Sequence, residues 1–550
     1  MAGLEALAHR LEQGTGPEVL VAADLQVHLD ALADLTEDPR ATTAALVSRL
    51  PPCGPGSPGD VRAEGADVRV LGARFTGAMR VAAVDRAAAA TAARRAARSA
   101  GKPDGDPVDH LVQALMDGGT PVGAVSLDPW PWRRGPDGPD AEAFGQLLGA
   151  IGPERSHALR LARATKTEDG AWATLVSRPL SRRLTPAALR LGLSPNQVTV
   201  TSFVIGLAAA AGFATGARPG LVAGALLLQL SLVLDCVDGD VARYRRAFSA
   251  TGAWLDASTD RLKEFACYGG LAWGAGGGRE VWLLAGVVLT VQTVRHSVDY
   301  TFTAVNELRE ADASPGAPAS RAVLASSRSN RRAGVKWAKR VLHLGIGERW
   351  AVLSILAALG RPVAALVVLL LLALVSFGYT AAGRTLRARA WTSTEPPARE
   401  REIVAAQLDL GPLPPAPAGW LTQRLTGGLA GGSSAFLWLR PALVRVTEYA
   451  VVLALGWAAV DSGTTAAAFV LLLVVASHHY DQLYRVLQGL RAGSDRTRAL
   501  GLGVVGRLLV VTALAATTAL EGGLWVMAGA LGMLFLVVEP VGVLREARDV

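Results

Sequence analysis

The feature that most constrains this chain is a series of apolar segments that begins near Pro195. A helix needs about 20 mainly apolar residues to cross a bilayer. Ten segments approach that length, at about 198–214, 219–235, 253–273, 281–304, 349–360, 362–382, 441–460, 464–478, 501–520 and 523–543. They predict a mostly α-helical, polytopic membrane protein. With 51% hydrophobic and 19% charged residues, the composition excludes disorder as the dominant state and argues against a wholly soluble enzyme.

Charges in the connecting segments predict the orientation of these helices. If residue 195 is cytoplasmic, the arginine-rich connections 305–348, 383–440 and 479–500 are cytoplasmic too, whereas the opposite loops are short and hold at most one arginine each. This bias follows the positive-inside rule, and it places both termini in the cytoplasm. Arginine supplies nearly all of the basic charge, as in GC-rich bacteria. We therefore expect a multi-pass protein of a bacterial inner membrane.

The net charge of +8 is explained by the basic connections between spans. Zinc-finger, RNA-recognition and basic-zipper patterns are absent from the sequence, so we expect membrane lipids and no nucleic acid among its partners.

The first 165 residues differ from the rest. Short β-like runs, such as 19–23 and 122–127, alternate with alanine-rich stretches, and the start lacks the pattern of a signal peptide. This predicts a small cytosolic α/β domain over 1–165, followed by a membrane core over 166–390, a linker over 391–436 and a C-terminal four-span region over 437–550. The stretch Val19–Asp24 resembles part of a nucleotidyltransferase domain, but a glycine-rich basic loop is missing from the start of the sequence. We interpret the domain as degenerate or regulatory.

Two pairs of carboxylates lie at the ends of apolar segments. Asp235 and Asp238 are spaced i, i+3, whereas Asp256 and Asp260 are spaced i, i+4, so each pair falls on one helix face. An ionised carboxylate within a membrane helix costs about 2.5–3.5 kcal/mol on insertion scales and calls for a compensating cation. Two facing helices with two carboxylates each predict an oxygen-rich site for Mg²⁺ or Mn²⁺. The alternative, for either pair alone, is carboxylates solvated at a helix end.

The residues around these acids narrow the interpretation. Gly239 and Ala242 keep the surface beside the first pair shallow, and Arg243 supplies a planar cation for phosphate. Gly252 allows a close approach of the second helix. The stretch resembles, at every position, the signature of the CDP-alcohol phosphatidyltransferase family, as Asp235-x2-Asp238-Gly239-x2-Ala242-Arg243-x8-Gly252-x3-Asp256-x3-Asp260. The resemblance covers roughly residues 166–386 and implies a six-helix membrane core.

The resemblance implies an enzyme of phospholipid biosynthesis. It would transfer a phosphatidyl or other phospho-alcohol group from a CDP-alcohol, such as CDP-diacylglycerol, to an acceptor hydroxyl and release CMP. It would work as a homodimer with two divalent ions per site. By position, the metal ligands are Asp235, Asp238, Asp256 and Asp260, and Asp260 is also the catalytic general base. The CDP site comprises Asp235, Asp238, Gly239, Ala242, Arg243 and Gly252, and similarity of 194–199 to the entry segment of the inositol-phosphate-using branch adds Asn196 and Thr199.

An acceptor that carries a phosphate needs cations near the metal site. The candidates are Arg245 and Arg246 after the second span, Lys263 one turn beyond Asp260, Arg295 within the fourth span, and Lys336, Lys339 and Arg340 before the fifth. Arg295 is the most informative, because an intramembrane arginine that faced lipid would be costly. Together they favour an anionic acceptor, such as an inositol phosphate, over a neutral polyol.

Two other functions stay open at this point. The same chemistry could join two soluble polyol phosphates instead of making a lipid. A transporter could use the carboxylates as a cation path, and it would show metal-dependent flux without CMP release. In the C-terminal region, whose role the sequence does not assign, His478 and His479 point about 100° apart on a helix. They make a poor chelating pair, and we expect them to be polar anchors at the membrane interface.

Overall fold

The computed structural model describes residues 2–37, 43–48, 69–70, 73–99, 106–118, 120, 122–135, 137–166, 169–312, 333–389, 391, 398–409, 411, 436–490 and 495–546. They divide into two compact units. The N-terminal unit comprises the residues up to Thr165 together with Asp240–Phe248. The membrane unit comprises Lys166–Gly239, Ser249–Asp312 and the described residues that follow.

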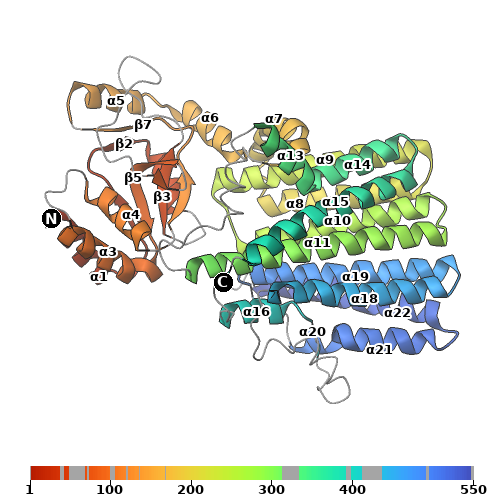
Figure 1. Cartoon of the computed structure of the whole chain (residues 1–550). Helices are drawn as coiled ribbons and strands as arrows, with labels where there is room; N and C mark the ends of the chain where they lie inside the picture. Colours follow the sequence, from red (N-terminus) through yellow and green to blue (C-terminus); the bar gives the residue numbers. More distant parts are fainter. Residues whose placement is uncertain are drawn as a thin grey trace. The chain divides into compact units, whose positions relative to one another are not determined.

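The N-terminal unit is built on a mixed β-sheet (Figure 1). Its strands are β1 (Glu18–Val21), β3 (Ala44–Ser48), β4 (Arg69–Val70), β5 (Ala73–Val81) and β6 (Gly123–Ser126). The order is β1-β5-β3-β6, with β4 paired to β5; β3 and β6 are parallel, and the other pairs are antiparallel. A separate antiparallel pair joins β2 (Leu25–Val27) to β7 (Trp132–Arg134).

Helices cover both faces of this sheet. In β3, Ala45 and Val47 pack with α1 (Ala2–Gln13), α3 (Arg86–Ser99) and α4 (Pro107–Asp117), whereas Ala44 and Leu46 pack with α2 (Leu29–Thr36). This period of two is the one expected for a strand buried on both faces. Helices α5 (Pro139–Gly149) and α6 (Pro153–Ala164) complete the unit. The predicted small α/β region at the N-terminus is confirmed.

Six helices form the core of the membrane unit. They are α8 (Pro195–Ala214), α9 (Arg218–Arg245), α10 (Ala250–Gly274), α11 (Arg279–Asp312), α14 (Ile346–Ala358) and α15 (Pro362–Ala388). Helix α8 begins as the sequence predicts, because Ser194 and Gln197 form a reciprocal capping box and Pro195 occupies the first turn. Shorter helices precede, interrupt and follow this core along the chain: α7 (Arg178–Arg190), α13 (Ala333–His343) and α16 (Ala398–Ala406).

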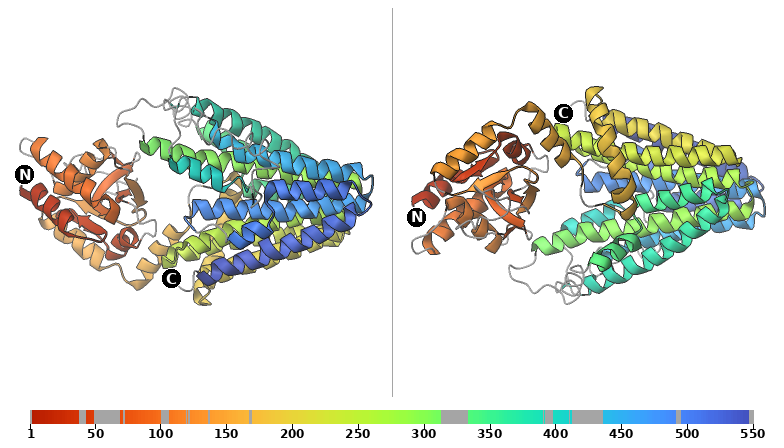
Figure 2. Two further views of the ribbon diagram at one scale, coloured as in Figure 1. Left: turned by 90° about the horizontal axis from the view of Figure 1, so that it is seen from below. Right: turned by 90° about the horizontal axis from the view of Figure 1, so that it is seen from above.

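The C-terminal helices pack directly against the core. They are α18 (Arg440–Ala458), α19 (Ser462–Leu487), α20 (Asp495–Leu500), α21 (Gly503–Ala515) and α22 (Leu520–Met533), which continues through a π-helical turn (Leu534–Val538) into α23 (Glu539–Glu546). Figures 1 and 2 show α18 and α19, in blue, running beside the green α11. One hydrophobic cluster includes Leu271 of α10, Leu289 of α11 and Leu472 of α19. The six core helices and the C-terminal helices therefore share an interior.

Eight helices of the described chain are long and apolar enough to cross a membrane, against the ten segments predicted. The other two segments are helical but differ in kind. Helix α10 has the length, but its Asp256, Asp260, Arg261, Lys263 and Glu264 make it too polar by composition. Helix α14 has only 13 residues. The chain is a mostly helical, multi-pass membrane protein, as predicted, with eight rather than ten spans identified by length and hydropathy.

Candidate active site

The structure brings the four signature carboxylates together between α9 and α10. One oxygen each from Asp235, Asp238 and Asp256 lies within 4.8 Å of the others. Asp260 joins the cluster through Lys263, whose Nζ lies 2.8 Å from Asp260 Oδ1 and 3.2 Å from Asp235 Oδ1. The i, i+3 and i, i+4 spacings thus place all four side chains on facing surfaces of the two helices.

The carboxylate cluster fits a divalent cation. Asp256 Oδ1 is buried and has no hydrogen-bond partner among the described residues, so that it is available as a ligand. Three carboxylates within reach of one point form the hard, oxygen-only donor set that Mg²⁺ and Mn²⁺ prefer. The cluster is therefore compatible with divalent metal binding.

Lys263, one of the predicted acceptor ligands, lies inside the carboxylate cluster. Its side chain is fully buried, and its ammonium donates to Ser202 Oγ at 2.9 Å as well as approaching Asp235 and Asp260. It therefore offsets negative charge inside the carboxylate cluster. Sequence spacing puts Lys263 one turn from Asp260, which is why the two side chains meet.

The start of α8 contributes to the same site. Thr199 Oγ1 donates to Asp238 Oδ2 at 2.6 Å, so that it orients one of the candidate ligands. Asn196 lies next to Gly252: a Cβ added at Gly252 would come within 3.2 Å of Asn196 Oδ1 and 2.9 Å of Ser249 Oγ. The glycine in the signature thus permits a close approach of α8 and α10.

Two residues in the middle of the signature, Ala242 and Arg243, belong to the N-terminal unit. There Arg243 donates to Asp240 Oδ1 at 2.7 Å and to the carbonyl oxygen of Ala164. It also lines a cavity of about 380 Å³ within that unit. Asp240 is fully buried, and it is absent from the predicted site residues although its i, i+3 spacing to Arg243 is the signal of a helical ion pair. Ala242 lies one residue before Arg243 and is partly buried, and Gly239 ends this stretch of the membrane unit.

A second, strongly basic cavity of about 870 Å³ lies within the membrane unit. Among the described residues that line it, seven are Lys or Arg and two are Asp: Lys166, Arg261, Arg295, Arg340, Arg349, Arg384 and Arg387, with Asp169 and Asp299. His296 and His343 also line it. This excess of cations suits a ligand that carries a phosphate.

Arg295 is held at this cavity by polar groups on three sides. It donates to the carbonyl oxygen of His343 at 2.8 Å and contacts His296 Nε2 at 2.7 Å and Ser376 Oγ at 3.2 Å. Its side chain is buried within the protein, which satisfies the expectation that it does not face lipid. Of the other acceptor candidates, Arg245 is exposed on the N-terminal unit, and the side chain of Lys336 lies outside the described residues.

Neighbouring charges perturb two groups at the cavity. Burial lowers the pKa of His343; the charge of Asp299 acts to raise it, but the charges of nearby arginines lower it, so that its imidazole is neutral at neutral pH. Burial acts to raise the pKa of Asp169, but the hydrogen bond and charge of Arg178 outweigh it and lower that pKa. The positive charge of the cavity therefore comes from Lys and Arg side chains.

Several cavity residues were not predicted as acceptor ligands. Arg349 donates to Glu264 Oε1 at 2.6 Å and to Oε2 at 2.9 Å, and Arg384 donates to Asp299 Oδ1 at 3.0 Å. In the sequence, Arg384 reads as a topology-setting charge, and Arg349 begins an apolar segment. Both arginines lie next to an apolar run, and this position could have marked them as candidate ligands, because an arginine there needs a partner or a ligand.

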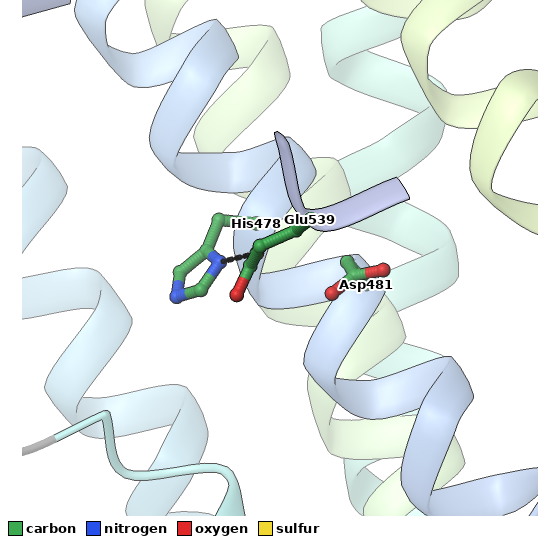
Figure 3. A group of neighbouring side chains, drawn as sticks. All are labelled: His478, Asp481 and Glu539. Atoms are coloured by element: carbon green, nitrogen blue, oxygen red, sulfur yellow. Dashed lines mark hydrogen bonds and ion pairs between the residues drawn. The ribbon is translucent and has the colours of Figure 1, made fainter. Parts of the chain in front are cut away.

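A separate acid–histidine group lies in the C-terminal helices (Figure 3). His478 Nδ1 lies 3.1 Å from Glu539 Oε2, while Asp481 accepts a hydrogen bond from Trp254 and pairs with Arg485. These partners already engage the groups that would bind a metal ion. His478 and His479 are buried inside the protein, so the expectation that they anchor the membrane interface is wrong.

Comparisons with known proteins agree with this geometry. Residues 193–327 match the family model described as CDP-alcohol phosphatidyltransferase. Residues 426–545 match a family described as being of unknown function, DUF5941.

Three relatives illustrate the similarity. The chain is 42% identical over 88 residues to the archaetidylinositol phosphate synthase of Methanothermobacter thermautotrophicus, covering 16% of this chain and 44% of the relative. It is 36% identical over 104 residues to a bifunctional IPC transferase and DIPP synthase of Aquifex aeolicus, covering 19% and 23%. It is 32% identical over 125 residues to the phosphatidylinositol phosphate synthase of Mycobacterium marinum, covering 23% and 51%. The chain thus spans about half, or less, of the length of these relatives.

Proposed function

We propose, from the premise that residues 193–327 form a CDP-alcohol phosphatidyltransferase domain, that this protein transfers a substituted phosphate from a CDP-alcohol to a hydroxyl of an inositol phosphate and releases CMP. The observation that carries the proposal is the occurrence, within one membrane unit, of a carboxylate cluster on α9 and α10 and a cavity lined by seven cationic side chains. The first suits a diphosphate with its metal ions, and the second suits an acceptor phosphate.

In this mechanism Asp235, Asp238 and Asp256 would hold Mg²⁺ or Mn²⁺, and Asp260 would complete the ligand set. The ions would neutralise charge on the diphosphate of the donor. Asp260 takes the proton of the acceptor hydroxyl as that oxygen bonds to the phosphorus bearing the alcohol, and the bond to the CMP oxygen breaks. Lys263, 2.8 Å from Asp260 Oδ1, keeps this carboxylate oriented and ionised. Thr199 orients Asp238.

The same proposal covers the rest of the donor site. Gly239, Ala242, Arg243 and Gly252 contact CDP, with Asn196 beside Gly252. Arg295 and the other cavity arginines bind the acceptor phosphate. The relatives from M. thermautotrophicus and M. marinum are named as inositol phosphate lipid synthases, which supports an inositol phosphate as acceptor and a lipid donor such as CDP-diacylglycerol. We further propose a homodimer in a bacterial inner membrane, with the active site and both termini on the cytoplasmic side.

A second candidate function is the joining of two soluble polyol phosphates by the same phosphotransfer chemistry. The match to a bifunctional IPC transferase and DIPP synthase favours it. Extraction of the product distinguishes the two, because a lipid product enters the organic phase and a product of two soluble polyols stays in water. The N-terminal unit keeps its interpretation as a degenerate or regulatory nucleotidyltransferase-like domain, as a prediction.

The test is CMP release by the full-length protein in lipid nanodiscs. The assay offers CDP-diacylglycerol or a soluble CDP-polyol with Mg²⁺ or Mn²⁺, and inositol 1-phosphate, inositol or glycerol 3-phosphate as acceptor. We expect turnover with inositol 1-phosphate, loss of at least 100-fold in Asp260→Asn because the general base is removed, and normal turnover in Asp117→Asn, an exposed carboxylate of the N-terminal unit. Metal-dependent cation flux without CMP release would replace the proposal by the transporter alternative.

A further inference from the structure

Helix α19, in the segment that matches a family of unknown function, presents a polar face to the core. Tyr480, Asp481, Tyr484 and Arg485 are all buried and are spaced i, i+1, i+4 and i+5 along the helix. Residues with this spacing share one side of a helix. The face is directed at α10 and α11, with which α19 packs.

The two tyrosines contact residues that line the basic cavity. Tyr484 Oη accepts a hydrogen bond from Arg261 Nε at 3.1 Å, and its ring lies edge-on to Tyr300 at 5.9 Å between centroids. Tyr480 Oη is hydrogen-bonded to His296 Nδ1, and its ring lies 5.5 Å from the guanidinium carbon of Arg261. Arg261, His296 and Tyr300 all line the cavity of about 870 Å³. Three of the residues that line the cavity are thus contacted by tyrosines of α19.

The same face also holds α10 itself. Trp254 Nε1 donates to Asp481 Oδ1 at 2.7 Å, and Asp481 Oδ2 pairs with Arg485 Nε at 2.7 Å. Trp254 precedes Asp256 by two residues, so that the two side chains point about 200° apart around the helix. The hydrogen bond therefore fixes the side of α10 that faces away from the carboxylate cluster.

We propose that the C-terminal helices form a positioning element for the active site. Tyr480 and Tyr484 fix the cavity arginine, histidine and tyrosine that receive the acceptor, and Asp481 fixes the rotation of α10. This inference rests on the proposed function, because it assumes that the cavity binds the phosphorylated acceptor. It gives the residues that match a family of unknown function a defined task. They are positioning residues, since they act through Arg261, His296, Tyr300 and Trp254.

The first test uses Tyr484→Phe in the full-length protein, which removes the acceptor of the Arg261 hydrogen bond and keeps the ring. We expect the KM for inositol 1-phosphate to rise about tenfold, as for a lost hydrogen bond to a charged group, with kcat and the KM for the CDP-alcohol within twofold of wild type. The matched control is Tyr449→Phe: this buried hydroxyl bonds to His479 at 2.7 Å and is not among the residues that line the cavity. It should leave the acceptor KM unchanged.

Two further measurements make the outcome decisive. Binding of radiolabelled inositol 1-phosphate, measured without a donor, should weaken in Tyr484→Phe by the same factor as the KM. Trp254→Phe should instead lower kcat and raise the Mg²⁺ concentration for half-maximal rate, with the acceptor KM unchanged. If wild type releases CMP but Tyr484→Phe and Tyr449→Phe have equal acceptor KM values, the positioning role is refuted. If wild type releases no CMP with any acceptor, the proposed function fails instead.

Discussion

The buried pair of Arg349 and Glu264 offers a quantitative test of the packing beside the cavity. Both side chains are buried, and Arg349 donates two hydrogen bonds to the Glu264 carboxylate, at 2.6 and 2.9 Å. Removal of one partner from a buried pair costs about 3–5 kcal/mol. In Arg349→Met the carboxylate would keep Arg261 Nη1 at 3.0 Å and Tyr268 Oη at 2.6 Å. We therefore expect a loss near the lower end, about 3 kcal/mol of the free energy of unfolding.

The assay follows unfolding by the exposure of thiols. Cys236 and Cys267 are buried in the membrane unit, so a thiol reagent added during a denaturant titration reports its unfolding in a Cys53→Ser background. The matched control is Arg399→Met, because the Arg399–Glu402 pair is 64% exposed on both sides and should contribute less than about 1 kcal/mol.

A double variant separates the lost charge partner from lost packing. Glu264→Gln added to Arg349→Met removes the uncompensated carboxylate and should regain part of the stability, since a neutral amide is cheaper to bury than an unpaired charge. Equal unfolding free energies for Arg349→Met and Arg399→Met would refute the reasoning, and so would a double variant less stable than the single one.

Three other predictions concern activity. Thr199→Val removes the 2.6 Å hydrogen bond to Asp238. Loss of about 1.5 kcal/mol from the transition state should lower kcat about tenfold, whereas Thr199→Ser should keep most of the wild-type kcat. The KM for the phosphorylated acceptor should rise below about pH 6, because protonation of a phosphate monoester lowers its charge from −2 towards −1. Burial lowers the pKa of His343, so this side chain gains its charge only at lower pH and does not offset the loss. Inositol, which has no phosphate, should show no such rise in KM. Gly206→Ala should lower kcat more than the KM for either substrate, because the added Cβ would lie 2.6 Å from Lys263 Cδ and displace the ammonium that balances the carboxylates.

Much of the fold follows from local signals. Hydropathy locates the ten helical segments, and the i, i+3 and i, i+4 spacings predict the shared face of Asp235 with Asp238 and of Asp256 with Asp260. The number of membrane spans depends on more than local hydropathy. The 253–273 segment is a helix, but its charged side chains form hydrogen bonds with Tyr484, Arg349 and Ser202, which lie far away in the sequence.

The grouping of the acidic side chains at the candidate site could be predicted from the sequence, but the positions of the cationic side chains could not. Lys263 could turn towards the acceptor or towards the carboxylates, and its spacing to Asp260 permits both until Ser202 and Asp235 are placed beside it. Arg384 looks like a charge that sets topology and Arg349 like the first residue of an apolar segment, because membrane orientation and ligand binding place arginine at the same helix ends. Which arginine meets a carboxylate is decided by tertiary packing, and sequence spacing alone carries no information about it.

The polar contacts between α19 and the core have a consequence for how such chains can diverge. A relative without the four C-terminal spans would lack the α19 partners of the side chains at positions 254, 261 and 296, so that an indole N–H, one guanidinium N–H and an imidazole nitrogen would each need a new partner. The residues that contact these three positions should therefore change together with the presence or absence of the C-terminal region. Chains that lack it should carry an apolar side chain at 254 and other partners for the cavity-lining residues at 261 and 296. Chains that keep it should keep a hydroxyl at 484 and a carboxylate or amide at 481.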